Sequence, residues 1–424
     1  MSRVVVAGAG LAGHEVVRRL LADPGFDGTI TWHAGEPGRP YNRVLLTDLL
    51  AGHHAPSAVE LPTLTDPRLT YRTTPLRTIA EAEFDHLVLA TGAEPVIPPV
   101  RGNAVPLRTL ADVRTILGEL EGAGGAVPAN REARANREPL ANREADPGRR
   151  QVGAVAMGRG LLSGRKHSGG RRIAVVGGGP LGVETACALV SRGMRVELLH
   201  RGPHLLSRWL DAESASLLAD SLTEAGIIVH CDTDISAATG VWPSADLVIL
   251  ACGTCPRVAL ARTAGLPLGT GILVDPCGRS IGDDRIFAIG DCAETIGVSS
   301  PTGALGAFEG ARRAVAAIGG VASTQPAIVA PLRLRTYDIP GADVAVLGTP
   351  RAEPSIQFTD QRRRTRKVLA LDGDVPVAAA LVGDVGAAAA LARAIARPSA
   401  PAPRVPAALL TSGAGRGAGG FGNA

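Results

Sequence analysis

The strongest constraint on the fold of this chain is a glycine-rich motif that occurs twice. The two copies are VVVAGAGLAG at residues 4–13 and IAVVGGGPLG at residues 173–182. In each copy, an apolar run leads into G-x-G-x-x-G and then into a helical pattern. The glycines permit a tight turn that brings a nucleotide pyrophosphate close to a helix N-terminus. The sequence therefore predicts an α/β protein with two Rossmann-like, three-layer units and two bound dinucleotides.

Composition and charge exclude several other classes of protein. The chain has 424 residues, 45% of them hydrophobic, which is enough for two or three domains. The net charge is +4 and no long basic stripe with interleaved aromatic residues is present, so we expect no nucleic-acid partner. No apolar run reaches the length of a transmembrane helix, and the six cysteines are scattered rather than arranged as a secreted disulfide framework. We expect a cytoplasmic protein that does not associate with membranes.

Hydrophobic periodicity predicts the main elements of both units. Apolar runs mark strands at residues 3–7, 30–33, 85–90, 172–176, 195–199 and 246–251. Helical spacing marks residues 11–21, 181–192 and 311–318. The C-terminal part, residues 330–410, alternates short strands and turns and ends in an alanine-rich helix, which predicts a small α+β domain.

Two segments do not fit this pattern. Residues 121–170 are low in complexity and repeat ANRE three times, so we expect a disordered insertion. We also expect the glycine-rich tail, residues 411–424, to be disordered. The basic run at residues 362–367 is short, and we interpret it as a solvated turn rather than a docking patch.

The first motif has a partner at the expected distance along the chain. Gly8, Gly10 and Gly13 are predicted to hold an adenosine diphosphate moiety. Glu36 follows them by about twenty residues, where this fold places an acid that accepts hydrogen bonds from ribose hydroxyls. The alternative is a glycine cluster that packs a helix without a ligand.

Two further motifs carry a resemblance to a known family. Thr91-Gly92 ends a predicted strand, and the sequence IFAIGDCA occupies residues 286–293. A chain with two glycine fingerprints, a T-G turn and a G-D motif resembles the FAD/NAD(P)-dependent pyridine-nucleotide oxidoreductases. The resemblance implies that Asp291 binds the flavin ribityl chain and that Thr91 and Gly92 lie along the FAD. It also implies that the second glycine set cradles the NAD(P) pyrophosphate, namely Gly177, Gly179 and Gly182.

The same resemblance implies how the chain divides into domains. The FAD-binding domain would be discontinuous and comprise residues 1–120 and 286–325. The NAD(P)-binding domain would comprise residues 171–285. Hydride transfer between the two cofactors needs no protein acid or base, because the protein supplies orientation and electrostatics.

A shorter element indicates a branch of this family. PYNRVLL at residues 40–46 is similar to an element of the NAD(P)H-nitrite reductase large subunit and of the electron-transfer subunits of assimilatory nitrate reductases. By this likeness Arg43 lies near the flavin phosphates or ring. Rubredoxin and ferredoxin reductases usually carry Lys where this chain has Asp48. The stretches RKVLALDG at residues 366–373 and AALVGD at residues 379–384 extend the likeness to the same nitrite reductases.

The resemblance also suggests an electron acceptor. The cysteines form no closely spaced quartet, so we expect no iron–sulfur cluster, sirohaem or other metal in this chain. We therefore expect an electron-transfer subunit, monomeric or homodimeric, that passes electrons to a separate redox protein. A nitrate or nitrite reductase is favoured as that acceptor over a small iron–sulfur protein. The alternatives are a rubredoxin- or ferredoxin-type reductase and a slow-turnover flavoprotein redox sensor.

The nicotinamide side leaves several points open. Glu184 either faces the gap between flavin and nicotinamide or stabilises a helix N-terminus. His200 and Arg201 end a strand where an acid would favour NADH, and arginine suits the 2′-phosphate of NADPH, so both nucleotides remain candidates. Cys252 and Cys255 form a C-x-x-C that could act as a redox dithiol. We favour a structural role for this pair, with Gly253 lining the approach of the nicotinamide.

Overall fold

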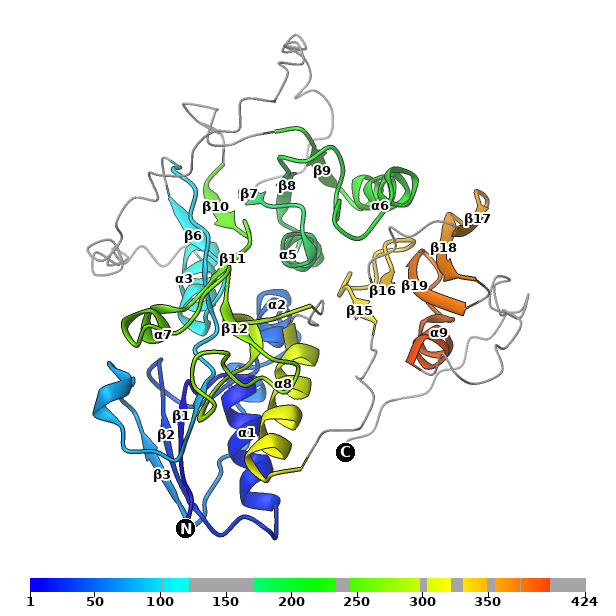
Figure 1. The fold of residues 1–424 in the computed structure, drawn as a ribbon. Coiled ribbons are helices and arrows are strands. Elements are labelled where there is room, and N and C mark those ends of the chain that lie inside the picture. Colours follow the sequence, from blue (N-terminus) through cyan, green and yellow to red (C-terminus); the bar gives the residue numbers. More distant parts are fainter. Residues whose placement is uncertain are drawn as a thin grey trace, which may run out of the picture.

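The computed structural model describes residues 1–100, 103–121, 171–233, 245–297, 303–321, 331–348, 355–373 and 375–396. These residues form two five-stranded parallel sheets and one five-stranded antiparallel sheet, each with its own helices, together with two short two-stranded sheets (Figure 1). Apart from Glu121, the insertion and the tail for which we expect disorder lie outside the described residues. None of the helices in the described part of the chain combines the length and apolar character needed to cross a bilayer.

The first sheet contains five parallel strands in the order β13-β4-β1-β2-β3. Its strands are β1 (Arg3–Ala7), β2 (Thr29–His33), β3 (Leu69–Arg72), β4 (His86–Leu89) and β13 (Ile286–Ala288). One face is covered by α1 (Leu11–Ala22) and α8 (Gly303–Ile318). The other face packs against α7 (Ala259–Thr263) and the two-stranded ribbon of β12 (Ile272–Val274) and β14 (Ala293–Thr295). Burial on both faces explains why the central strands are continuously apolar.

The second sheet repeats the parallel arrangement in the order β6-β10-β7-β8-β9. Its strands are β6 (Ala104–Pro106), β7 (Arg172–Val176), β8 (Arg195–Leu199), β9 (Ile227–His230) and β10 (Leu247–Leu250). The helices α3 (Leu110–Glu121), α5 (Pro180–Ser191) and α6 (Ala212–Glu224) bury their apolar sides in one core with this sheet. The expected α/β class is thereby confirmed.

One boundary differs from the sequence-based expectation, which placed residues up to 120 in the first unit. Strand β6 pairs with β10 of the second sheet. The α3 residues Val113 and Ile116 are buried in the core that contains Ile173 and Val175. Residues 104–121 therefore belong to the second unit, because their backbone hydrogen bonds and their apolar side chains are both satisfied there.

The C-terminal domain is an antiparallel sheet in the order β15-β16-β19-β18-β17, with one helix on a face. Its elements are β15 (Leu332–Arg333), β16 (Val344–Leu347), β17 (Ser355–Asp360), β18 (Thr365–Asp372), β19 (Val375–Val382) and α9 (Ala388–Ala396). The prediction of a solvated turn at residues 362–367 is partly wrong. Arg366 and Lys367 lie in β18 and are buried, because Asp211 and Asp384 form ion pairs with them.

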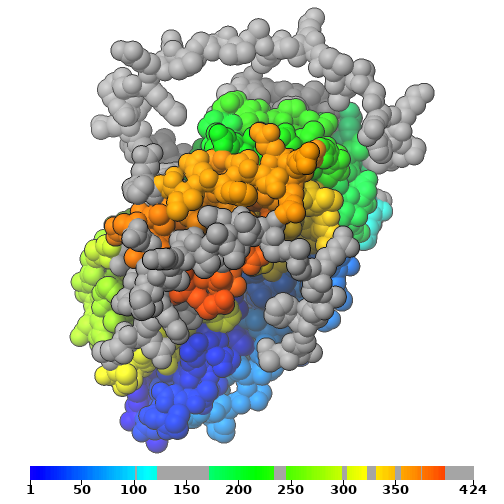
Figure 2. All heavy atoms as spheres, turned by 90° about the vertical axis from the view of Figure 1, so that its right-hand side faces the viewer, coloured from blue at the N-terminus to red at the C-terminus, as the bar shows by residue number. Residues whose placement is uncertain are grey.

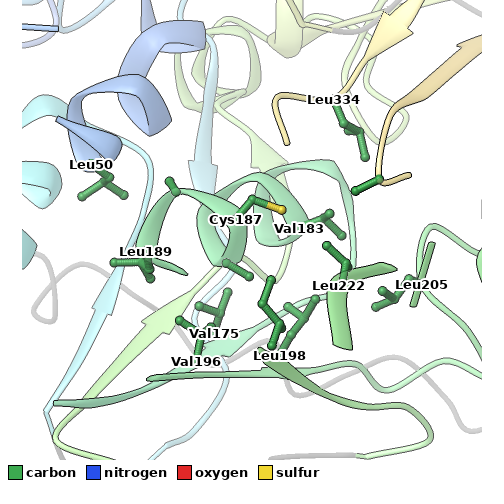
Figure 3. Packing of buried hydrophobic residues seen from close by; sticks show 14 of the residues in the cluster. Leu50, Val175, Val183, Cys187, Leu189, Val196, Leu198, Leu205, Leu222 and Leu334 are labelled. Atoms are coloured by element: carbon green, nitrogen blue, oxygen red, sulfur yellow. The ribbon is translucent and has the colours of Figure 1, made fainter. Parts of the chain in front are cut away.

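All three parts meet around α5. The core there includes Leu50 of α2 (Leu46–Ala51), Val183 and Cys187 of α5, and Leu334 of the C-terminal domain (Figure 3). Figure 2 shows the C-terminal domain, in orange and red, against the green second unit and beside the blue first unit. The helix that follows the second glycine motif therefore lies at the centre of the molecule.

Candidate functional site

The first glycine motif forms a turn in which two glycines are tightly packed and one faces open space. Gly8 has φ +120°, and a Cβ there would overlap the carbonyl group of Ala90. A Cβ on Gly13 would overlap the carbonyl group of Gly8. Gly10 caps α1 with extended backbone and no side-chain hydrogen bond, and a Cβ there would meet nothing within 4 Å. The first and third glycines are thus needed for packing, while the middle one leaves space before a helix N-terminus, which suits a pyrophosphate.

The second glycine motif repeats this geometry. Gly177 has φ +121° and packs against the carbonyl group of Ala251. Gly182 packs against the carbonyl group of Gly177. Gly179 caps α5, and a Cβ there would again meet nothing within 4 Å. Both turns therefore offer backbone N–H groups and open space to a nucleotide.

A short antiparallel ribbon joins the ends of the two parallel sheets beside these turns. Strand β4 continues through Thr91 into β5 (Ala93–Pro95), and β10 continues through Gly253 into β11 (Thr254–Pro256). The two short strands pair with each other. Thr91 Oγ1 donates to the carbonyl oxygen of Arg257 at 2.7 Å. The ribbon therefore joins the carboxyl ends of the two parallel sheets, which is where ligands bind in sheets of this kind.

A glycine directly precedes each strand of the ribbon. Gly92 has φ +70° and its carbonyl oxygen accepts from the Arg257 N–H at 2.9 Å. Gly253 has φ +95° and its carbonyl oxygen accepts from the Val96 N–H at 3.0 Å. The left-handed backbone at both positions favours glycine, because a Cβ there would be strained.

The structure brings Glu36 and Arg43 together, as a single polar group with Tyr41. The Tyr41 hydroxyl donates to Glu36 Oε2 at 2.6 Å, and the Arg43 guanidinium forms an ion pair with Glu36 Oε1. Arg43 follows Asn42, whose side chain caps the short helix η1 (Arg43–Leu45). Burial raises the pKa of Tyr41 to about 12, so its hydroxyl remains a donor. The carboxylate has lone pairs left for ribose hydroxyls.

Asp291 lies in the short helix η4 (Gly290–Cys292), at the end of β13. Its Oδ2 accepts from Arg108 Nη2 at 2.6 Å. Arg108 also donates from Nε to the carbonyl oxygen of Ala93 at 3.3 Å, which places it between the two sheets. Cys292 is fully buried, and burial raises the pKa of its thiol, so it is an inert core residue.

His200 and Arg201 directly follow β8, beside the second glycine turn. His200 Nδ1 accepts from the Gly178 N–H at 3.2 Å. Burial lowers the pKa of His200, which favours the neutral ring. Arg201 is exposed, as is Arg208 on the following loop. The strand is therefore followed by one histidine whose neutral form is favoured and by two exposed arginines.

The C-x-x-C pair is asymmetric. Cys252 packs in the small core under the second sheet and donates from Sγ to the carbonyl oxygen of Val176 at 3.5 Å. Burial raises the pKa of its thiol. Cys255 is exposed in β11, and both thiols are free. A raised pKa disfavours the thiolate that dithiol exchange requires.

Glu184 lies in α5, on the side that contacts α2 and the C-terminal domain. Its Oε1 accepts from the backbone N–H of Arg335 at 3.0 Å. Burial raises its pKa to about 7, the nearby carboxylate of Asp48 acts in the same direction, and Arg335 opposes the shift. This carboxyl group therefore changes charge near neutral pH.

Sequence reasoning did not find Arg108 or Arg335. Arg108 meets Asp291 across 183 residues of chain, and Arg335 meets Glu184 across 151. Arginine has no local pattern that reveals a partner so distant. Tyr41 was not predicted either, although it lies in the same sequence element as Arg43.

Comparison with known proteins agrees with this geometry. Residues 2–319 match the pyridine nucleotide-disulphide oxidoreductase family. The chain is 25% identical over 330 residues to the NAD(P)H nitrite reductase of Bacillus subtilis strain 168, covering 70% of this chain and 35% of that protein. It is also 25% identical over 330 residues to the assimilatory nitrate reductase electron transfer subunit of the same strain, covering 69% of this chain and 36% of that protein.

A solved structure shows the same fold. The ferredoxin reductase from Rhodopseudomonas palustris has a TM-score of 0.70 at 20% sequence identity, covering 90% of this chain and 91% of that chain. The present chain spans about a third of the length of the two Bacillus relatives. The family match nevertheless includes both glycine turns, the ribbon and Asp291. The chain therefore belongs to the pyridine nucleotide-disulphide oxidoreductase family.

Proposed function

We propose that this protein carries electrons from NAD(P)H through FAD to a separate redox protein, and that this acceptor is an assimilatory nitrate or nitrite reductase. The observation that carries the first part is the β5·β11 ribbon, which turns the carboxyl ends of the two nucleotide-binding sheets toward each other. The names of the two Bacillus relatives support the second part.

On the FAD side, the turn of Gly8, Gly10 and Gly13 would hold the pyrophosphate, with Glu36 on the ribose. Arg43 would lie near the flavin phosphates, and Asp291 would hold the ribityl chain, with Thr91 and Gly92 alongside. Tyr41 and Arg108 would orient the two carboxylates, since each donates a hydrogen bond to one of them. These residues lie in residues 1–100 and 286–321, which we propose as the FAD-binding unit, together with Arg108 from the second.

On the nicotinamide side, Gly177, Gly179 and Gly182 would hold the NAD(P) pyrophosphate. His200 and Arg201 would lie near the adenosine ribose, and Gly253 near the nicotinamide. A bound FAD would supply two-electron redox chemistry, namely uptake of a hydride from the nicotinamide and release of the two electrons to the acceptor, with the proton passing to solvent. The protein's part is to hold both rings in register and exclude water.

The nitrate and nitrite branch is supported by Asp48. Rubredoxin- and ferredoxin-type reductases usually carry Lys at this place, whereas here a buried carboxylate forms an ion pair with Arg335 at 3.1 Å. A reductase for a small iron–sulfur protein is the second candidate, and its support is the likeness of fold to the ferredoxin reductase.

The first test is an anaerobic titration of the purified protein with NADH and, separately, NADPH, followed by flavin absorbance. We expect the flavin bands to bleach at about one equivalent, because one hydride reduces one flavin. The nucleotide that bleaches them faster is the physiological donor. A flavin that stays oxidised with both nucleotides would leave a redox sensor, and protein without flavin would refute the proposal.

The acceptor is tested with the reduced protein. We expect rapid reoxidation by the catalytic subunit of a nitrate or nitrite reductase, measured by return of the flavin bands. A rubredoxin and a [2Fe–2S] ferredoxin serve as competing acceptors under the same conditions. Faster reoxidation by either of these would favour the second candidate.

A further inference from the structure

A polar cluster, which we call the junction cluster, occupies the place where the C-terminal domain meets both nucleotide-binding units. It consists of Asp48 of α2, Glu184 of α5, and Arg335 and Tyr337 of the segment after β15. The apolar core beside it contains Leu50, Val183 and Leu334 from the same three parts (Figure 3). Asp48 is buried, and Glu184, Arg335 and Tyr337 are partly buried.

Arg335 makes contacts with all three neighbouring segments. Its Nε forms an ion pair with Asp48 Oδ2 at 3.1 Å. Its backbone N–H donates to Glu184 Oε1 at 3.0 Å. Its Nη1 donates to the carbonyl oxygen of Val44 at 2.9 Å. Val44 follows Arg43, the residue that holds Glu36, so Arg335 connects the FAD-side segment to the NAD(P)-side helix.

The backbone after Arg335 adopts a conformation that non-glycine residues avoid. Tyr337 has φ +49° and Asp338 has φ +60°. Left-handed backbone is unfavourable for such residues and is retained where surrounding contacts require it. Here it directs the Tyr337 hydroxyl to Asp48 Oδ1 at 3.0 Å, with the Tyr337 ring edge-on to His53 at 5.2 Å between centroids. The strain therefore serves the junction cluster.

We propose that Arg335 is a positioning residue for hydride transfer, contributed by the C-terminal domain, which clamps α5 to α2 and holds Glu184 in place. The inference rests on the proposed function. Glu184 lies five residues, or about one and a half turns, after Gly179, the open cap at which the NAD(P) pyrophosphate would bind. A clamp on this helix matters because small errors in the distance between reacting groups slow a transfer strongly.

The charge of Arg335 affects the pKa of Glu184, so the role of Arg335 can be measured through pH dependence. Burial raises the pKa of Glu184 to about 7. The charged and titratable groups that face this carboxyl are Asp48 from α2, Cys187 from α5, and Arg335 and Tyr337 from the C-terminal domain. Arg335 is the group among them that lowers the pKa, so its removal should raise the pH at which Glu184 loses its proton.

The test measures anaerobic flavin reduction by stopped flow from about pH 6 to pH 9. The full chain is compared as wild type, Arg335→Met and Arg335→Lys. Arg333→Met is the matched control, because Arg333 is exposed on β15, two residues earlier. We expect Arg335→Met to retain FAD but to lose about tenfold in limiting reduction rate, with its pH profile displaced upward. Arg335→Lys should recover most of the rate, and the control should behave as wild type.

Four results would overturn the inference. The first is an Arg335→Met protein with the wild-type rate and pH profile. The second is a lower melting temperature with rate and profile unchanged, which would make Arg335 merely structural. If Arg335→Met does not fold, Glu184→Gln is measured instead. Loss of the pH-dependent change in flavin reduction rate would support the role of the junction cluster, and persistence of that change would contradict it. Wild-type flavin that neither nucleotide reduces refutes the proposed function itself, and the inference with it.

Discussion

Glu184 illustrates at the scale of single residues how burial sets chemistry. Its carboxyl group lies between α5, α2 and the C-terminal domain, and burial raises its pKa to about 7 from an ordinary value of 4.5. The unfolded chain would lose this proton near the lower value. The folded protein therefore binds more protons than the unfolded chain between these two pH values, and its free energy of unfolding falls as pH rises through that window.

This predicts a pH-dependent effect of Glu184→Gln. The neutral amide can still accept from the Arg335 N–H and has no proton to lose. Relative to wild type, the variant should gain stability between about pH 5 and pH 8, by roughly 3 kcal/mol at most. Urea unfolding at both pH values measures the difference, with Glu121→Gln, exposed at the end of α3, as the control. Equal differences at both pH values would contradict the assigned pKa.

Cys255→Ser tests the dithiol alternative. Cys255 is exposed, whereas Cys252 is packed against a core and burial raises the pKa of its thiol. We expect the variant to keep its rate of flavin reduction and reoxidation within about twofold of wild type, because electrons reach the acceptor from the flavin. A loss of turnover with unchanged flavin reduction would instead assign a redox role to the pair.

At the scale of elements, the two glycine turns show which glycines pack and which leave space. Each first and third glycine fits against a backbone carbonyl, so its hydrogen atom is required by the fold itself. Each middle glycine has ordinary extended backbone and open surroundings. The motif therefore combines a structural requirement of the fold with open space that suits a bound pyrophosphate.

The two requirements can be separated by substitution. Gly10→Ala should fold normally but retain little FAD, because its methyl group would occupy the space before α1. Gly179→Ala should keep FAD and bind NAD(P)H about tenfold more weakly. Gly13→Ala should be destabilised by roughly 2 kcal/mol or more through overlap with Gly8. Flavin absorbance, nucleotide titration and thermal unfolding distinguish the three, and FAD retained by Gly10→Ala would contradict the assignment of the first turn.

For the whole molecule, the C-terminal domain is held against the second unit by a buried cation. The Arg366 side chain is 5% exposed and forms ion pairs with Asp211 at 3.0 Å and with Glu213. Asp211 caps α6 by accepting from the Ser214 N–H at 2.7 Å. Burial would raise the pKa of Asp211, but hydrogen bonds from Arg366 and Ser214, together with the charge of Arg366, leave the pKa lowered.

Removal of this cation should weaken the whole fold. We expect Arg366→Met to lower the free energy of unfolding by about 2 kcal/mol, because Asp211 loses its partner while remaining partly buried. Arg362→Met, at an exposed position of the same basic run, should change it by less than about 0.5 kcal/mol. Urea unfolding compares them. Equal effects of the two substitutions would show that the pair at Arg366 contributes nothing to stability.

Local patterns predicted most of the architecture but not how its parts meet. Apolar runs identify β1, β7 and β10, since strands buried on both faces are continuously hydrophobic. They did not predict β6, because its three residues are one alanine, one valine and one proline and form no long apolar run. These residues become a strand by pairing with β10. Likewise, the basic run around Arg366 predicts a solvated side chain, because its acidic partner Asp211 at the start of α6 is distant in the sequence.

What the sequence by itself determined are the features encoded within a few residues, namely the two glycine turns, the strands that lead into them, and the acid and G-D motifs at fixed spacing. These depend on backbone geometry, which neighbouring residues specify. The tertiary structure alone decided that Arg108 meets Asp291, that residues 104–121 join the second sheet, and that Arg335 bridges Asp48 and Glu184. Such contacts join residues far apart in the chain, and their partners are set by how the sheets and domains pack.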